Sequence, residues 1–288
     1  MPDHHLEESV TPQQMQCMEV WGGNHYSNNT FEMPGLRVWL FSRPHANARA
    51  GGDVCYLSSC ASGRITRLLL ADVSGHGASV STTATKLRDI MRKNINRIDQ
   101  SRFVTQMNQC FSEVTDLSGA FATAVVCTFF APSKILTMSI AGHPMPLILR
   151  HGRQDWSEMV SNTPEIHGLA NLPLGVDDRM RYSKFNTRLQ SGDRVLIYSD
   201  GISECLDESG NMLNSRGLQK LAAGIDSSHS QDFLPRLISR IEELDGQNLK
   251  TDDSTAILIE ATETPVPMIN NFLAPVRIVQ SLFAGRTE

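Results

Sequence analysis

Acidic residues stand beside glycines or sharp turns at four places in the chain, each at the end of a β-rich run. They are Asp53 in Gly51-Gly52-Asp53, Asp72 in Asp72-Val73-Ser74-Gly75-His76-Gly77, Asp200 in Ser199-Asp200-Gly201, and the pair Asp252-Asp253. A strand end projects a side chain at the rim of a sheet, and an adjacent glycine lets the backbone turn sharply and leaves space for a ligand. We therefore expect these carboxylates to converge at one end of a β-structure.

Converging carboxylates repel one another and raise each other's pKa unless cations neutralise them. Oxygen ligands without paired His or Cys favour Mn²⁺ or Mg²⁺ over zinc. Two such ions, about 3.5–4 Å apart, can activate water and stabilise charge on phosphoryl oxygens. The residues therefore predict metal-assisted hydrolysis of a phosphate ester, with His76, four residues from Asp72, as a candidate proton donor.

Each motif alone also has a purely structural interpretation. An Asp-Gly pair is commonly a turn, and the glycines after Asp72 could simply open a helix. His76 and His143 could shape loops through hydrogen bonds, and Asp193 in Ser191-Gly192-Asp193 is typical of a turn. The prediction of chemistry therefore rests on the set of motifs rather than on any one of them.

Short β-rich runs and helical stretches alternate between residue 36 and about residue 260, without a Gly/Ser-rich linker that would divide them. Many strands at short spacing predict extensive antiparallel sheet. The runs with strand character, several bounded by Gly, Pro, Asn or Asp, are residues 36–41, 54–59, 65–72, 122–130, 135–141, 146–150, 182–189, 195–199 and 254–260.

Two consecutive amphipathic helices are predicted over residues 78–98 and 102–114, where apolar residues recur at helical spacing. Two more are expected near residues 218–223 and 231–244. Groups of strands interrupted by a helical pair and followed by further helices favour an α+β fold, with sheets packed on each other and helices outside.

Composition excludes several classes of protein. The chain has 288 residues and a formal net charge of -5, which gives no electrostatic reason to expect a nucleic-acid partner. No apolar run is long enough to span a bilayer, so we expect no membrane contact and a cytoplasmic location. The six cysteines form no CxxC pair and no zinc-type spacing, which favours free thiols.

We expect three regions: an N-terminal extension over residues 1–35, a catalytic domain over residues 36–260 and a C-terminal extension over residues 261–288. The last region is interrupted by three prolines yet remains apolar. It could pack on its own domain, pair with a second copy or meet another protein.

The ordered set of motifs closely resembles the PPM or type 2C phosphatases, specifically the bacterial branch typified by sporulation stage II protein E and the Rsb regulators of sigma factors. The resemblance covers about residues 36–260, and its string DVSGHG followed by SDG and DD is specific as a set. The motifs that carry it are Gly51-Gly52-Asp53, Asp72-Val73-Ser74-Gly75-His76-Gly77, Phe121-Ala122-Thr123, Ala141-Gly142-His143-Pro144, Pro173-Leu174-Gly175, Gly192-Asp193, Tyr198-Ser199-Asp200-Gly201 and Asp252-Asp253-Ser254-Thr255.

This resemblance implies a four-layer αββα sandwich with two Mn²⁺ or Mg²⁺ ions in a cleft at one end of the sheets. By the matching motifs, Asp72 would bridge the ions, assisted by the carbonyl of Val73. Asp53 would act through metal-bound water, while Asp200 and Asp252 would hold the second ion. Asp253 is also a candidate metal ligand, so the resemblance leaves open which of Asp252 and Asp253 binds, and relatives often carry Asn at its position. After Asp53, relatives commonly have an aromatic residue and then Asp, and this chain lacks that carboxylate.

The resemblance further implies a protein serine/threonine phosphatase that uses metal-activated water, without a phosphoenzyme. Its substrate would be phosphoserine or phosphothreonine on a signalling protein, such as a STAS-domain anti-sigma-factor antagonist. The helices over residues 78–114 would act as a switch that responds to an activating partner or to a homodimer contact. Two alternatives remain open: a pseudophosphatase that binds a partner without turnover, and a phosphatase for a small phosphorylated metabolite.

Overall fold

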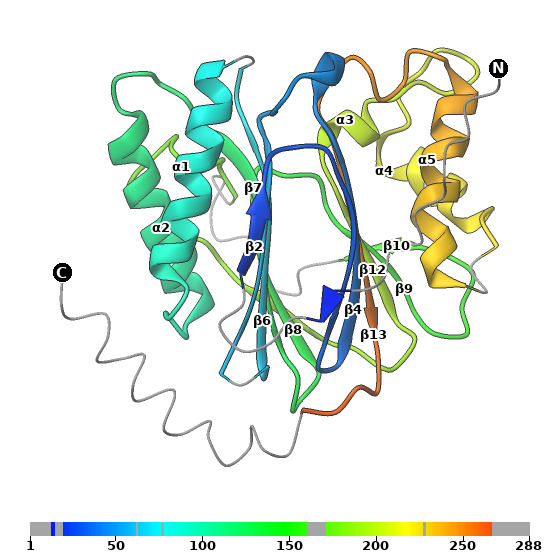
Figure 1. Cartoon of the computed structure of the whole chain (residues 1–288), viewed down its shortest axis with the longest axis horizontal. Coiled ribbons are helices and arrows are strands. Elements are labelled where there is room, and N and C mark those ends of the chain that lie inside the picture. Colours follow the sequence, from blue (N-terminus) through cyan, green and yellow to red (C-terminus); the bar gives the residue numbers. More distant parts are fainter. Residues whose placement is uncertain are drawn as a thin grey trace.

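Two β-sheets lie face to face in the computed structural model, and helices cover the outer face of each (Figure 1). The structure describes residues 13–14, 20–61, 63–75, 78–159, 171–226 and 229–266. This arrangement confirms the α+β class that the sequence pattern predicts and the four-layer αββα sandwich that the family resemblance implies.

One sheet has seven strands and the other has six. In the seven-stranded sheet the order is β1 (Gln13–Gln14), β3 (Ser27–Met33), β4 (Leu36–Arg43), β13 (Ser254–Ala261), β12 (Arg194–Tyr198), β9 (Leu147–Leu149) and β10 (Ser157–Glu158). In the six-stranded sheet it is β11 (Phe185–Arg188), β8 (Ile135–Ala141), β7 (Ala122–Phe130), β6 (Ile65–Val73), β5 (Asp53–Cys60) and β2 (Val20–Gly23). Neighbouring strands are antiparallel, except that β1 runs parallel to β3.

Helices of different parts of the chain cover the two sheets (Figure 1). The pair α1 (Ala78–Asn94) and α2 (Gln100–Thr115) packs on the six-stranded sheet, and α3 (Asp200–Ser203), α4 (Asn214–Ala223) and α5 (Phe233–Leu244) lie over the seven-stranded sheet. Two short 3₁₀ turns, His45–Asn47 and Ser230–Asp232, complete the described elements. Asp99 starts α2 by accepting a hydrogen bond from the backbone N–H of Arg102.

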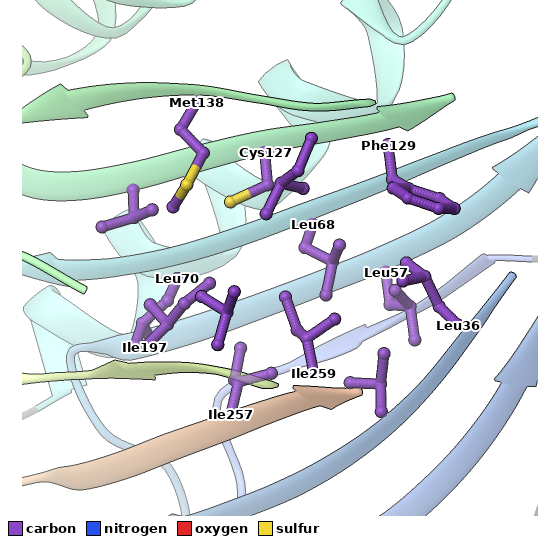
Figure 2. Packing of buried hydrophobic residues seen from close by; sticks show 14 of the residues in the cluster. Leu36, Leu57, Leu68, Leu70, Cys127, Phe129, Met138, Ile197, Ile257 and Ile259 are labelled. Atoms are coloured by element: carbon purple, nitrogen blue, oxygen red, sulfur yellow. The ribbon is translucent and has the colours of Figure 1, made fainter. Parts of the chain in front are cut away.

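Side chains alternate between two hydrophobic cores along the central strands. Leu68 and Leu70 of β6 face the core between the sheets, where they meet Ile257 and other residues of the opposite sheet (Figure 2). Leu69 and Ala71 point the other way and pack beneath α1 and α2. Successive residues of a strand project to opposite faces, so both faces of this sheet are buried. The strand ends are consequently held in a fixed register.

Every strand predicted from the sequence is present, with bounds that differ by a few residues. The structure adds β1, β2, β3 and β10, the short helix α3 and the 3₁₀ turns. The strands β2 and β3 lie within the expected N-terminal extension but pair with β5 and β4. The proposed division into a domain and two extensions remains a prediction, and residues 267–288 of the C-terminal extension lie outside the described residues.

The described cysteines agree with the expectation of free thiols. Five cysteines in the described ranges are free thiols, and Cys17 lies outside those ranges. Among the helices of the described ranges, none is both long enough and apolar enough to cross a membrane.

Candidate active site

The register of the six-stranded sheet places Asp53 and Asp72 side by side. Asp53 is the first residue of β5, and its Cα partner on the neighbouring strand β6 is Asp72. The same register runs without interruption to the pair Cys60 and Ile65 at the other end of the hairpin. The two carboxylates therefore lie together because the pairing of the whole hairpin fixes them there.

The other acidic residues come from the seven-stranded sheet and the short helix α3, which lies toward the upper end of the sandwich in Figure 1. Asp200 begins α3 just after β12 ends, and Asp252 and Asp253 immediately precede β13. Strands β12 and β13 are antiparallel partners, so the end of the first lies beside the start of the second. A Cβ atom at Gly201 would overlap the carbonyl oxygen of Asp253, which shows how closely the two segments approach.

Hydrogen bonds link Asp53 and Asp253 each to a segment of the opposite sheet. Asp53 Oδ2 accepts a hydrogen bond from Ser199 Oγ at 2.8 Å. The carboxylate of Asp253 accepts from the backbone N–H of His45 at 2.6 Å and from that of Gly52 at 2.5 Å. A side chain at Gly51 would collide with this carboxylate and displace it from these hydrogen bonds. Asp253 thus fixes the loop that leads into Asp53.

The carboxyl groups at this end of the sandwich raise one another's pKa. Burial raises the pKa of Asp72 to about 7, with further contributions from Asp200 and Asp252. Burial and then the charge of Asp72 raise the pKa of Asp53 well above its usual range, although hydrogen bonds from Thr255 and Ser199 oppose this. Burial followed by Asp252 also raises the pKa of Asp200. The predicted acidic sites therefore form one electrostatic cluster.

Glu204 is a further member that the sequence patterns did not indicate. Burial, then Asp200 and Asp252, raises the pKa of its carboxyl group. It follows Asp200 by four residues, and its backbone N–H bonds to the carbonyl of Asp200 across the single turn of α3. Asp200 and Glu204 are four residues apart, the spacing of neighbours on one face of a helix. A helix of four residues, however, is too short to be recognised by the periodicity of its sequence.

The donor set fits a divalent cation in chemistry and in charge. All the clustered side chains offer carboxylate oxygens, and Asp53 Oδ1 is buried without a hydrogen-bond partner. Hard cations such as Mg²⁺ and Mn²⁺ bind such oxygens. As the side chains stand, no three His, Cys, Asp or Glu side chains within the described ranges converge closely enough to surround an ion.

The sequence also singled out His76, His143 and Asp193, and the structure describes the last two. His76 lies outside the described residues. His143 is buried, its Nδ1 lies 2.8 Å from Thr123 Oγ1, and burial lowers its pKa to about 3, so it is a neutral structural residue at pH 7. Asp193 is buried and accepts hydrogen bonds from Arg150, His151 and Gln190, which agrees with its interpretation as a turn residue.

The raised pKa values predict that the cation-free protein loses stability as the pH rises. A carboxyl group with a higher pKa in the folded state binds its proton more tightly there, so the folded state is favoured at low pH. For Asp72 this stabilisation is lost between about pH 4 and pH 7. We expect the melting temperature in EDTA to fall by roughly 5 °C or more between about pH 5 and pH 7.5.

Differential scanning calorimetry across this pH range measures the effect. An Asp72→Asn variant is the control, because it lacks the group with the shifted pKa and should show a shallower slope. A melting temperature in EDTA that is constant, or that rises with pH in this window, would contradict the coupling of these carboxyl groups.

The sequence profile of one protein family, described as Stage II sporulation protein E (SpoIIE), matches residues 62–262, which is more than half of the chain. A curated relative, the phosphoserine phosphatase RsbU of Bacillus subtilis (strain 168), is 24% identical over 193 residues. That match covers 67% of this chain and 54% of the relative. The chain therefore spans about half the length of this relative.

Solved structures show the same fold. The RsbU and RsbW domains of Rv1364c from Mycobacterium tuberculosis match with a TM-score of 0.62 and 21% identity, over 90% of this chain and 64% of that chain. RsbX in complex with magnesium matches with a TM-score of 0.59 and 13% identity, over 82% of this chain and 100% of that chain. At these identities the likeness establishes the architecture of the two sheets and their helices.

Proposed function

The chain belongs to the family of Stage II sporulation protein E, and from that premise we propose that it is a metal-dependent protein serine/threonine phosphatase. The observation that carries the proposal is the electrostatic cluster of Asp53, Asp72, Asp200 and Asp252, which is assembled from both sheets at one end of the sandwich. Such a concentration of negative charge would repel a phosphate ester unless cations were bound.

We assign the metal-binding roles as follows. Asp200, Asp252 and Asp253 all raise the pKa of Asp72, and this carboxylate would bind both ions. The backbone carbonyl of Val73 would assist at one ion, and Asp200 with Asp252 would hold the other. Asp53, whose Oδ1 has no hydrogen-bond partner, would contribute through a bound water molecule.

The residues of the chain orient this site, and bound cations would supply the nucleophile by lowering the pKa of water and would offset charge on the phosphoryl oxygens. Ser199 holds Asp53 Oδ2, which leaves Oδ1 available. The amide of Thr255 in turn donates to Ser199 Oγ at 3.0 Å, so this contact is anchored in β13. Mg²⁺ and Mn²⁺ are both compatible with the oxygen donors, and the neighbouring fold of RsbX was solved with magnesium.

The neighbouring residues Asp252 and Asp253 have separate proposed roles. We propose that Asp252, which is exposed and acts on the pKa of Asp72, Asp200 and Glu204, is the metal ligand. Asp253 instead positions the loop before Asp53, because its carboxylate accepts from two backbone N–H groups. It would therefore contribute to the site without binding an ion.

Isosteric amide variants separate these roles. Asp252→Asn should reduce metal-dependent hydrolysis about a hundredfold or more with an unchanged or higher melting temperature in EDTA, because a repulsive charge is removed. Asp253→Asn should lower the melting temperature by a few degrees and reduce activity less, because its NH₂ group would face a backbone N–H. Calorimetry and hydrolysis assays on both variants measure this, and the reverse pattern would exchange the two assignments.

The proposed substrate is phosphoserine or phosphothreonine on a signalling protein, such as a STAS-domain anti-sigma-factor antagonist. Two similarities support this choice: RsbU is described as a phosphoserine phosphatase, and the solved chain of Rv1364c joins an RsbU domain to an RsbW domain. We further propose a cytoplasmic location, with which the free thiols of the described residues are consistent.

The helices α1 and α2 are proposed to regulate the site through an activating partner or a homodimer contact. Val80 of α1 lies against the backbone of Gly52, since a Cβ atom built there would be 3.0 Å from Val80 Cγ1. A displacement of α1 would therefore reach the loop that carries Asp53. If substitution of exposed helix residues such as Lys86 and Lys93 changed neither Mn²⁺ affinity nor activation by any candidate partner, this regulatory role would be wrong.

The proposed activity is tested with synthetic phosphoserine and phosphothreonine peptides and with p-nitrophenyl phosphate. We expect hydrolysis in the presence of Mn²⁺ or Mg²⁺ and none after EDTA treatment, with activity restored when the ion is added back. Binding of phosphopeptide without turnover under either ion would favour a pseudophosphatase. Efficient turnover of small phosphorylated metabolites but not of peptides would favour a metabolite phosphatase.

A further inference from the structure

Four large apolar side chains are exposed together next to the acidic end of the six-stranded sheet. Leu117 is fully exposed, Val176 is 51% exposed, and Val114 and Phe121 are each 41% exposed. We call Val114, Leu117, Phe121 and Val176 the rim patch. A monomeric protein gains nothing in stability from such a group of exposed apolar side chains, and patches of this kind often mark binding surfaces.

Backbone pairing places Phe121 beside the segment that carries Val176. An isolated antiparallel bridge joins Ala122 to Leu174, with backbone hydrogen bonds of 2.9 and 2.7 Å. In this register the residue before Ala122, Phe121, lies opposite Gly175, and Val176 lies opposite Ala120. The side chain of Asn108, which is fully buried in α2, bonds to Gly175 N and to Asp177 O and so ties the Val176 loop to the helix.

Hydrogen bonds join Phe121 of the rim patch to Ser74, two residues after Asp72. The amide of Ser74 donates to the carbonyl of Phe121 at 2.9 Å, and the amide of Phe121 donates to Ser74 Oγ at 3.0 Å. Ser74 follows Val73, and Asp72 pairs with Thr123 on the strand that Phe121 precedes. A molecule that rests on the rim patch would therefore lie beside the segment that carries Asp72.

The charged residues around the patch are mainly acidic. Glu113 and Asp116 are exposed on either side of Val114, and Asp178 is exposed two residues after Val176. Arg179 is exposed as well, but it pairs with Asp177 and Asp178. A partner that complements this surface would present an apolar side chain with basic residues beside it.

We infer that the rim patch docks the protein substrate, by receiving an apolar side chain that lies close in space to the phosphorylated residue and is accompanied by Lys or Arg. This inference rests on the proposed phosphatase function. A stable interface between two copies would need about 20–30 residues on each side. Four side chains with an acidic margin suit the brief contact between an enzyme and its substrate better.

A phosphoserine peptide library tests the inference directly. The peptides carry one Leu or Phe, with or without an adjacent Lys, at positions before or after the phosphoserine, and a reference peptide carries only Ser, Gly and Asn around it. The wild-type protein with Mn²⁺ should hydrolyse at least one apolar-basic peptide with a kcat/KM about tenfold above the reference, through a lower KM. The double variant Leu117→Ser, Val176→Ser should lose this preference.

Matched measurements distinguish docking from chemistry and from misfolding. The double variant should hydrolyse p-nitrophenyl phosphate and the reference peptide as the wild type does. Ile98→Ser is the control, because it removes an apolar side chain of 78% exposure, intermediate between those of Leu117 and Val176, from the loop between α1 and α2. It should retain the peptide preference.

The remaining results distinguish failure of the docking inference from failure of the proposed phosphatase function. If the wild type hydrolyses p-nitrophenyl phosphate but shows no peptide preference, or if the preference survives in the double variant, the docking inference is wrong and the phosphatase function stands. If no ester is hydrolysed with either cation, the proposed function fails and the inference fails with it. A dimer in light scattering that the double variant abolishes, with unchanged peptide kinetics, would assign the rim patch to a contact between copies.

Discussion

Asp72→Asn is expected to abolish hydrolysis of a phosphoserine peptide, with a loss of roughly a thousandfold or more, while leaving the cation-free protein as stable as the wild type or more stable. The substitution keeps the shape of the side chain but removes its negative charge. In the wild type, that charge is repelled by Asp200, Asp252 and Asp253. Because that charge is repulsive without a cation and necessary for binding one, activity and stability should change in opposite directions.

The experiment compares Mn²⁺-dependent turnover with the melting temperature in EDTA at about pH 7.5, where the Asp72 carboxyl of the wild type is largely ionised. Asp155→Asn is the matched control, because Asp155 is an exposed carboxylate in a loop outside the cluster. It should alter neither quantity. A variant at position 72 that kept most of its activity would show that this carboxylate is not a metal ligand.

Gly201→Ala should impair both folding and activity, although it adds a single methyl group. A Cβ atom at this position would overlap the carbonyl oxygen of Asp253 and lie 3.1 Å from Ser254 Oγ. Backbone cannot rotate away as a flexible side chain can, so the turn that carries Asp252 must move relative to Asp200. We expect about 1–3 kcal/mol of lost stability and a fall in kcat of roughly a hundredfold, since displacement of catalytic groups by about 1 Å has effects of this size.

Gly246→Ala provides the control for the change of residue type, because no atom lies within 4 Å of a Cβ built there. Urea unfolding and peptide hydrolysis should leave this variant close to the wild type. If Gly201→Ala behaved like Gly246→Ala in both assays, the close approach of the turn before β13 to α3 would not be needed for the site.

The sequence predicted the central strands well because their residues have two buried faces. In β6 the run Leu68, Leu69, Leu70 and Ala71 serves two cores in alternation, which yields a continuous apolar run with an acidic residue at its end. The acidic residues could be expected to gather because each followed or preceded such a run at a turn. Their mutual influence on pKa values in the structure agrees with that expectation.

Elements that depend on tertiary pairing were not predictable in the same way. The strand β2 contains two glycines and β3 begins with Ser27, Asn28 and Asn29, all of low strand propensity, yet both strands pair along their length with β5 and β4. Tertiary context overrides local preference at such positions.

The separate roles of the two neighbouring aspartates could not be read from the sequence either. The structural role of Asp253 depends on the backbone amides of His45 and Gly52, which are about 200 residues away in the chain. No local pattern distinguishes it from Asp252. The register of distant strands is what assigns one carboxylate to the backbone and leaves the other near Asp200.

Diffraction from crystals grown with Mn²⁺, recorded at the manganese absorption edge, would locate the ions themselves. If carboxylates from both sheets jointly hold divalent cations, the anomalous difference map will contain two strong peaks beside the carboxylate of Asp72, one of them also within ligand distance of Asp200 and Asp252. A map without peaks at this end of the sandwich, or with manganese bound only elsewhere on the chain, would contradict the proposed active site.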